Sequence, residues 1–156
     1  MKQVALRQAG AASVAFAIVP LIASAQVLTA ADAIHRIQQH YSAALPPNTV
    51  DSVKAGDPTT PVTGIAVTFL DTMDVLREAS RRGANLVVTH EPTFYNHLDD
   101  SAFFADDPVY REKLTFIQQH HMVVFRLHDQ IHSVSPDPIA SALVAAPRLT
   151  KLHGAI

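Results

Sequence analysis

The strongest constraint on the fold is a strand–helix–strand pattern in residues 64–89. Residues 64–70, GIAVTFL, are mostly apolar and rich in β-branched side chains, which is typical of a buried strand. A helical segment follows and stops at Gly83, and residues 85–89, NLVVT, form a second short strand. A helix that crosses over between two strands predicts a parallel sheet with a right-handed connection, and therefore an α/β fold.

The remaining segments extend this sheet and its helical layers. Residues 122–127, MVVFRL, predict a third strand. Apolar residues at helical spacing predict further helices over residues 29–41, 108–120 and 138–145. Residues 51–61 are interpreted as a polar loop with a turn at its Gly-Asp-Pro, and residues 93–107 as a loop beside the site. We expect a short, mostly parallel sheet flanked by helices.

A histidine and a carboxylate follow each of the last two predicted strands. His90 and Glu91 come directly after one strand, and His128 and Asp129 after the other. The carboxyl ends of parallel strands meet at one edge of a sheet, where ligands bind in open α/β folds. Imidazole with carboxylate suits Zn, Mn, Fe or Ni, and the chain has no Cys to select thiolate-bound metals. The sequence therefore predicts a divalent-metal site at this edge.

An isolated histidine has a simpler interpretation, as a surface residue or a hydrogen-bonded cap. Five histidines are interpreted in this way, namely His35, His40, His97, His120 and His153. For His90 and the segment from His128 to His132, the repeated placement after parallel strands favours metal ligation.

The order of motifs resembles that of the NIF-three-like dinuclear-metal family, whose members are often named GTP cyclohydrolase type 2. The matching elements are DSVKAGDP at residues 51–58, Leu-Asp at 70–71, LVVTHEP at 86–92, and residues 123–132. The resemblance covers roughly residues 27–145. It implies the fold of the first half of that family and a divalent-metal cofactor at these motifs.

Two positions depart from the family pattern. Glu91 stands where the family has a second histidine, and His132 aligns with a late aspartate ligand. The two exchanges keep two imidazoles and one carboxylate, so they can compensate, or each can be a lost ligand. Asp129 stays a candidate ligand, and Asp71, at the end of the first strand, is expected to orient a ligand histidine.

The resemblance also implies a second half that returns a C-terminal His and Glu to the metal site. Ile156 ends this sequence without such an element. Two expectations stay open: a partner chain, such as a second copy in a homo-oligomer, completes the site, or residues 26–156 form a truncated domain with an impaired site.

The first 25 residues have the pattern of a signal peptide. Lys2 and Arg7 precede an uncharged apolar run that closes on Ala23-Ser24-Ala25, a small-x-small cleavage motif. We therefore expect an exported, periplasmic or secreted protein with no membrane segment after cleavage. Two of the 12 basic and none of the 14 acidic residues lie in this segment, so the remainder is acidic and does not suit nucleic acid.

Three functions follow from these features. The first is a metal-dependent hydrolase of a small-molecule substrate, with Glu91 or Asp129 as a ligand or base. The second is a non-catalytic metal-binding or assembly module, similar to the ring-like hexamers of the family. The third is an inactive, truncated remnant.

The signal pattern predicts that the mature protein begins at Gln26. Cleavage should occur after Ala25, because small residues stand at the two positions that the peptidase reads. Mass spectrometry of the protein expressed in a Gram-negative host, with periplasm and cytosol separated, measures this. An intact chain from Met1 to Ile156 in the cytosol would contradict the prediction.

Overall fold

The computed structural model describes residues 27–41 and 44–145, so the predicted signal peptide and His153 lie outside the described residues. The helices are α1 (Ala30–His40), α2 (Met73–Arg81), the short 3-10 helix η1 (Ala102–Phe104), α3 (Pro108–Gln119), α4 (Asp129–His132) and α5 (Pro138–Ala145). The strands are β1 (Val53–Ala55), β2 (Ile65–Thr68), β3 (Leu86–Thr89) and β4 (Val123–Arg126). None of the helices in the described part is long and apolar enough to span a bilayer.

The four strands form one mixed sheet in the order β1-β4-β3-β2. β2, β3 and β4 run parallel, and β1 pairs with β4 in the antiparallel direction. The predicted α/β fold with a short, mostly parallel sheet is therefore confirmed. Because Thr89 pairs in register with Arg126, the residues that follow β3 and β4 leave the sheet side by side.

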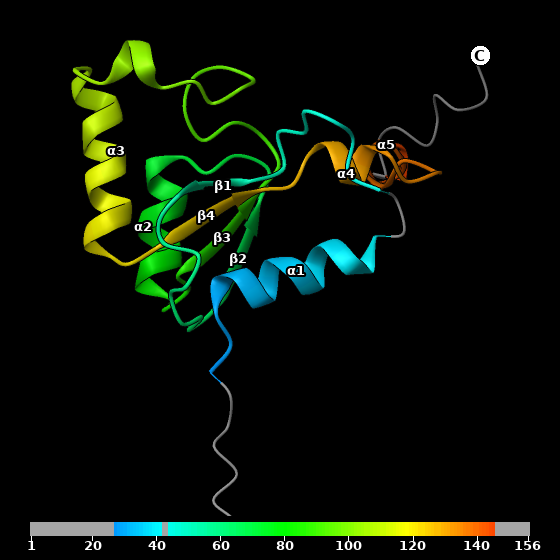
Figure 1. Cartoon of the computed structure of the whole chain (residues 1–156), viewed down its shortest axis with the longest axis horizontal. Helices are drawn as coiled ribbons and strands as arrows, with labels where there is room; N and C mark the ends of the chain where they lie inside the picture. The colour runs from blue at the N-terminus through cyan, green and yellow to red at the C-terminus, as the bar shows by residue number, and fades with distance from the viewer. Residues whose placement is uncertain (1–26, 42–43, 146–156) are drawn as a thin grey trace, which may run out of the picture.

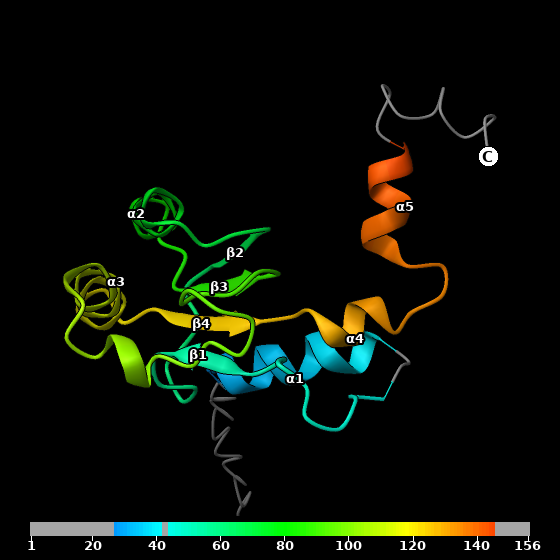
Figure 2. The ribbon, with the colours of Figure 1, turned by 90° about the horizontal axis from the view of Figure 1, so that it is seen from above.

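Helices cover both faces of the sheet, with α1 on one face and α2 and α3 on the other (Figures 1 and 2). Successive side chains of a strand point to opposite faces, so β3 and β4 supply both cores. Leu86, Val88, Val123 and Phe125 pack with the buried residues of α1. Val87 and Val124 pack with Leu76 of α2 and Ile117 of α3. Because both faces of these strands are buried, their sequences are nearly continuous apolar runs.

Side-chain caps fix where the main helices begin. Thr29 and Asp32 form a reciprocal capping box at the start of α1. The Thr72 hydroxyl accepts a hydrogen bond from Val75 N–H at the start of α2. The Asp107 carboxylate accepts bonds from two N–H groups at the start of α3, and Pro108 occupies its first turn.

The structure corrects the interpretation of residues 51–61 as a loop, because they contain β1. The strand has only three residues, too few to show a periodic pattern, and its ladder comes from β4. The turn after it passes very close to β4: a Cβ on Gly56, whose φ is 89°, would lie 2.1 Å from the Met122 carbonyl oxygen. Only glycine permits this approach.

A second correction concerns residues 64–70, which were expected to form a buried strand. β2 lies at the edge of the sheet and is partly exposed, with Ile65 47% and Val67 80% accessible. An apolar run cannot distinguish a central strand from an edge strand, since only pairing in the tertiary structure decides its neighbours.

Candidate metal centre

The candidate site is built where β3 and β4 end. His90 follows β3 directly and is buried, at 8% exposure. His128 stands two residues after β4, and the single turn of α4 then brings His132 back to the same edge, with His132 N–H bonded to the His128 carbonyl. Helical spacing of four residues places His128 and His132 on one side of that turn.

A buried carboxylate from the segment before β1 holds α4 in place. Asp51 Oδ1 accepts hydrogen bonds from His128 N–H at 2.7 Å and from Asp129 N–H at 2.8 Å. Asp51 Oδ2 accepts one from Gln130 N–H at 2.8 Å. These N–H groups have no partner within a helix, so Asp51 satisfies the amino end of α4 from 77 to 79 residues away in the sequence.

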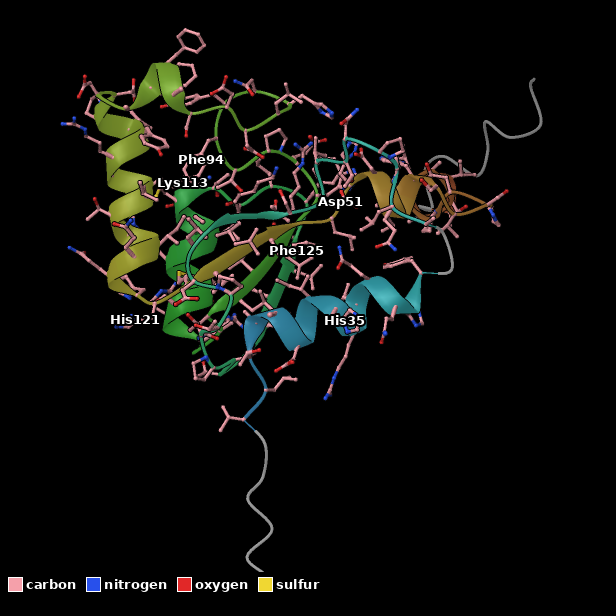
Figure 3. All side chains as sticks on the ribbon, viewed as in Figure 1. His35, Asp51, Phe94, Lys113, His121 and Phe125 are labelled. Carbon is pink, nitrogen blue, oxygen red and sulfur yellow. The ribbon has the colours of Figure 1, made fainter. Side chains whose placement is uncertain are left out.

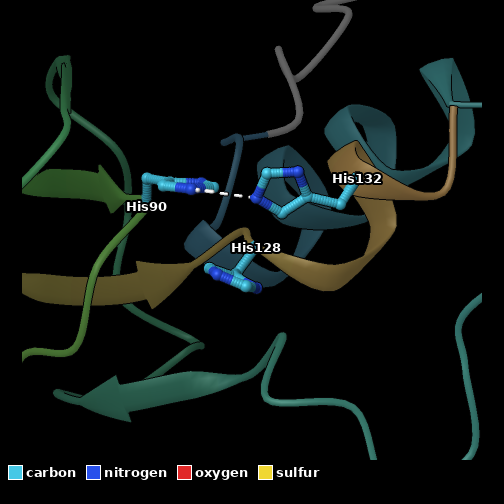
Figure 4. Close-up of side chains that lie close together, drawn as sticks. All are labelled: His90, His128 and His132. Atoms are coloured by element: carbon cyan, nitrogen blue, oxygen red, sulfur yellow. Dashed lines mark hydrogen bonds between the residues drawn. The ribbon is translucent and has the colours of Figure 1, made fainter. Parts of the chain in front are cut away.

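Three imidazoles gather at this edge (Figure 4). One nitrogen from each of His90, His128 and His132 lies within 4.8 Å of the other two. Nε2 of His90 and Nε2 of His132 are 3.3 Å apart, and the rings of His90 and His128 stack with centroids 4.6 Å apart. Ligand nitrogens around one first-row metal ion, with bonds of ~2.0–2.1 Å, are roughly 3–4 Å apart. The spacing therefore fits a shared ion.

Acceptor groups behind the rings fix the same tautomer for all three histidines. Nδ1 of His90 lies 3.2 Å from the Leu127 carbonyl oxygen, Nδ1 of His128 lies 2.9 Å from Asp129 Oδ1, and Nδ1 of His132 lies 2.6 Å from Asp137 Oδ2. Carbonyl and carboxylate oxygens only accept, so each Nδ1 carries the hydrogen. Each neutral ring therefore keeps its lone pair on Nε2, the nitrogen left free for a metal.

This arrangement produces electrostatic repulsion at the centre of the cluster. When both rings are neutral, the two Nε2 atoms of His90 and His132 bring lone pairs together at 3.3 Å. A proton or a metal ion between them removes that repulsion. Burial, together with the neighbouring His128 and His132, lowers the pKa of His90, which disfavours the proton. The arrangement is therefore suited to a metal cation.

The other residues proposed from the sequence lie around this cluster but not in it. Asp129 bonds His128 and also accepts from Val50 N–H at 2.9 Å. Burial acts to raise the pKa of Asp129, but these hydrogen bonds outweigh it and lower the pKa to about 2. Asp129 is thus an ionised carboxylate that orients His128. Its role as a direct ligand stays a prediction.

Glu91 and Asp71 point to a different part of the molecule. Glu91 lines a cavity between α2, α3 and the loop after β3, and it does not belong to the histidine group. Asp71 is fully buried and lies 3.4 Å from Lys113 Nζ of α3. The carboxylates that orient the imidazoles are Asp129 and Asp137. Ligation by Glu91 stays a prediction.

Several contributors were not found from the sequence. Asp51 bonds the start of α4, and Asp137 bonds His132. Neither contact can be predicted from the spacing of residues in the sequence. His97, interpreted as an ordinary loop residue, has its ring 5.4 Å from that of His128. The buried Arg126 fixes this loop, since it donates to the carbonyl oxygens of His90 and His97.

The fold and the site define an α/β protein with a histidine cluster that could hold a divalent metal at the carboxyl ends of two parallel strands. Residues 30–135 match the family described as Duf34/NIF3 (NGG1p interacting factor 3). The chain belongs to this family. No curated protein matches the chain.

Solved structures share the fold at low sequence identity. The hypothetical protein SA1388 from Staphylococcus aureus has a TM-score of 0.63 and 19% identity, covering 78% of this chain and 34% of its own. A Bacillus cereus protein related to NIF3 has a TM-score of 0.58 and 17% identity, covering 69% and 29%. Reduced HcgD from Methanocaldococcus jannaschii has a TM-score of 0.54 and 15% identity, covering 67% and 41%. This chain thus spans less than half the length of each.

The Asp51 contacts predict that Asp51→Ala lowers the free energy of unfolding by about 1–3 kcal/mol, because it leaves three N–H groups without their acceptor. Urea unfolding followed by circular dichroism measures this. Asp57→Ala is the matched control, since within the described residues its exposed carboxylate bonds Thr59 alone, and its loss should cost less than about 1 kcal/mol. Equal destabilisation by the two changes would refute the structural role of Asp51.

Proposed function

We propose that this chain is an exported protein that binds one divalent metal ion through His90, His128 and His132 and hydrolyses a small-molecule substrate there. The observation that carries the proposal is an oxygen beside each Nδ1, which assigns the ring hydrogen to Nδ1 and leaves Nε2 free. A structural histidine needs no such arrangement. Three histidines that share it within 4.8 Å match the donor set of a catalytic metal site.

The donor chemistry fits Zn, Mn, Fe or Ni, because imidazole ligates all four and no thiolate is present. A bound ion of this kind supplies Lewis acidity and lowers the pKa of a water at its open position. Asp129 and Asp137 hold the rings of His128 and His132 in their ligating orientation. Asp51 holds the turn that carries both histidines.

A cavity of about 320 Å³ beside His90 supports a small, partly apolar substrate. Its walls include Phe69, Leu127, Ile131 and Ile139. An apolar group bound there would lie against the ring of Phe69, which is 5.1 Å from that of His90. Apolar walls also exclude water from the reacting bond, which strengthens the electrostatic interactions at the site.

Export is supported by the signal pattern of residues 1–25, which lies outside the described residues. Cleavage after Ala25 would leave the histidine cluster intact, because His90 is the first of its members in the chain. Export would also place the substrate among periplasmic or extracellular molecules.

An assembly module is the second candidate function, and the exposed edge of the sheet favours it. Val67, Phe69 and Leu70 are 80%, 59% and 44% exposed on and just after β2. Apolar side chains on an unpaired edge strand invite pairing with another chain. A homo-oligomer could then supply further groups to the metal site, in keeping with the larger size of the neighbouring structures.

We predict that metal-stripped protein binds about one divalent ion per chain and that its affinity falls as the pH is lowered from 7.5 to 5.5. Ligation needs unprotonated imidazole, whose ordinary pKa is about 6.5, so protons compete increasingly below that value. Burial lowers the pKa of His90, so His90 itself stays available to a lower pH than a solvated histidine. Calorimetric titration with Zn and Mn at the two pH values measures this.

Two variants sharpen the metal titration. His90→Ala should weaken binding by at least about tenfold, as losses of metal-site residues typically do. Glu91→Ala should leave affinity unchanged if three histidines suffice, and should lower it if Glu91 ligates. An affinity that does not change with pH or with His90→Ala would exclude the histidine site.

The hydrolytic part of the proposal predicts metal-dependent turnover of a small ester, amide or phosphoester. A panel of such substrates is assayed with the stripped protein, with Zn or Mn restored, and with His90→Ala. Activity should appear with metal and vanish in the variant. Tight metal binding without turnover would instead favour the non-catalytic module, and neither activity nor binding would favour an inactive remnant.

A further inference from the structure

A second cavity, of about 460 Å³, is lined by Glu91 and by none of the three clustered histidines. The start of α2, the loop after β3 and the first half of α3 line it. Its walls are mainly apolar and aromatic, and they include Leu70, Met73, Phe94, Tyr95, Val109 and Tyr110. The volume is in the range of small-molecule sites, and nothing in the proposed metal chemistry uses it.

Lys113 supplies the amine of this cavity. Its side chain rises from α3 towards Phe94 (Figure 3), with Nζ 5.7 Å from the centre of the Phe94 ring. Only 13% of the side chain is exposed. Nζ donates one hydrogen bond, to the Thr93 carbonyl oxygen at 2.7 Å. An ammonium has three hydrogens, so the amine keeps bonding capacity towards the cavity that it lines.

Asp71 lies behind the amine and has no exposed surface. Its Oδ2 is 3.4 Å from Lys113 Nζ, and among residues 27–41 and 44–145 neither carboxylate oxygen has a partner at hydrogen-bonding distance and geometry. Burial raises the pKa of Asp71 to about 6, against the opposing effect of Lys113. Burial also lowers the pKa of Lys113. The two shifts bring the pKa values of Lys113 and Asp71 closer together, so a proton moves from the ammonium to the carboxylate more easily than between two solvated groups.

The charges around the cavity select the ligand. Asp71 already balances Lys113, and Glu91 adds a second carboxylate to the wall, so an anionic ligand would meet net repulsion. As an ammonium, Lys113 only donates hydrogen bonds, so a ligand that lies against it needs an acceptor such as a carbonyl oxygen. A neutral molecule with an aromatic body and a carbonyl group fits both the walls and the amine. A buried lysine in an apolar site is also a recurrent nucleophile towards carbonyl carbon.

We propose that this cavity binds a neutral aromatic aldehyde and that Lys113 condenses with it to an imine. The Lys113 nitrogen attacks the carbonyl carbon, a C–N bond forms, and the carbonyl oxygen becomes a hydroxyl. That hydroxyl leaves as water as the C=N bond forms. One amine and one aldehyde thus give one imine and one water, whose two hydrogens come from the amine. Asp71 takes protons from the nitrogen and returns them to the leaving oxygen. This proposal does not rest on the metal site.

Reductive trapping tests the proposal, because the chain has only four lysines, Lys2, Lys54, Lys113 and Lys151. Whole protein is incubated with 2-naphthaldehyde and sodium cyanoborohydride at pH 7.5, and the labelled peptides are mapped by mass spectrometry. Lys113 should be labelled at least about tenfold faster than each other lysine, because the cavity holds the aldehyde beside its amine and burial lowers its pKa. Excess 2-methylnaphthalene, which has no carbonyl group, should protect Lys113 alone by occupying the cavity.

Variants separate a built site from general reactivity. Lys113→Arg keeps the cation beside Asp71, so it should fold and lose the label. Val109→Trp should slow labelling by filling the cavity from an exposed wall position, and Leu143→Trp on α5, similarly exposed and outside the cavity, is its matched control. Labelling should persist in His90→Ala. Equal labelling of the lysines, or no protection by 2-methylnaphthalene, would overturn the proposal.

Discussion

The candidate metal centre depends on one buried carboxylate. Asp51 lies before β1 and bonds three consecutive N–H groups at the start of α4. Without it, the chain that leaves β4 would have buried donors and no fixed direction, since α4 is a single turn too short to hold itself. The antiparallel pairing of β1 with β4 brings Asp51 to that point. A strand of three residues at the edge of the sheet thus decides where His128 and His132 stand.

The buried charges on the two sides of His90 do different things. On one side, Arg126 is fully buried between the His90 and His97 carbonyl oxygens and Asp99, so it ties the loop after β3 to β4. On the other side, Asp71 and Lys113 face each other with incomplete hydrogen bonding. A buried guanidinium that bonds two carbonyl oxygens holds a segment rigid, whereas a buried pair with incomplete hydrogen bonding keeps a proton easy to move. The first arrangement suits a scaffold and the second a reactive site.

Glu91 separates these two regions. Its backbone N–H bonds the Phe69 carbonyl oxygen at 2.8 Å, which continues the β2–β3 pairing past the strand ends. That bond sets the direction of the chain, so His90 turns towards β4 while the Glu91 side chain lines the Lys113 cavity. The family motif that this chain resembles has two adjacent histidines. Here the first is His90, Glu91 takes the place of the second, and another imidazole comes from His132 on α4.

The sequence by itself determined the α/β class, the parallel order of the three strands and the edge where His90 and His128 meet, because apolar periodicity and crossover length are local properties. It did not reveal β1, whose three residues carry no period, or the exposure of β2, which depends on what lies beside it. Ligation by Glu91, which was proposed from its adjacency to His90, stays a prediction, and its side chain lines the Lys113 cavity. Only the tertiary structure brought Asp51 and Asp137 to the segment that carries His128 and His132, because these contacts depend on how the chain packs.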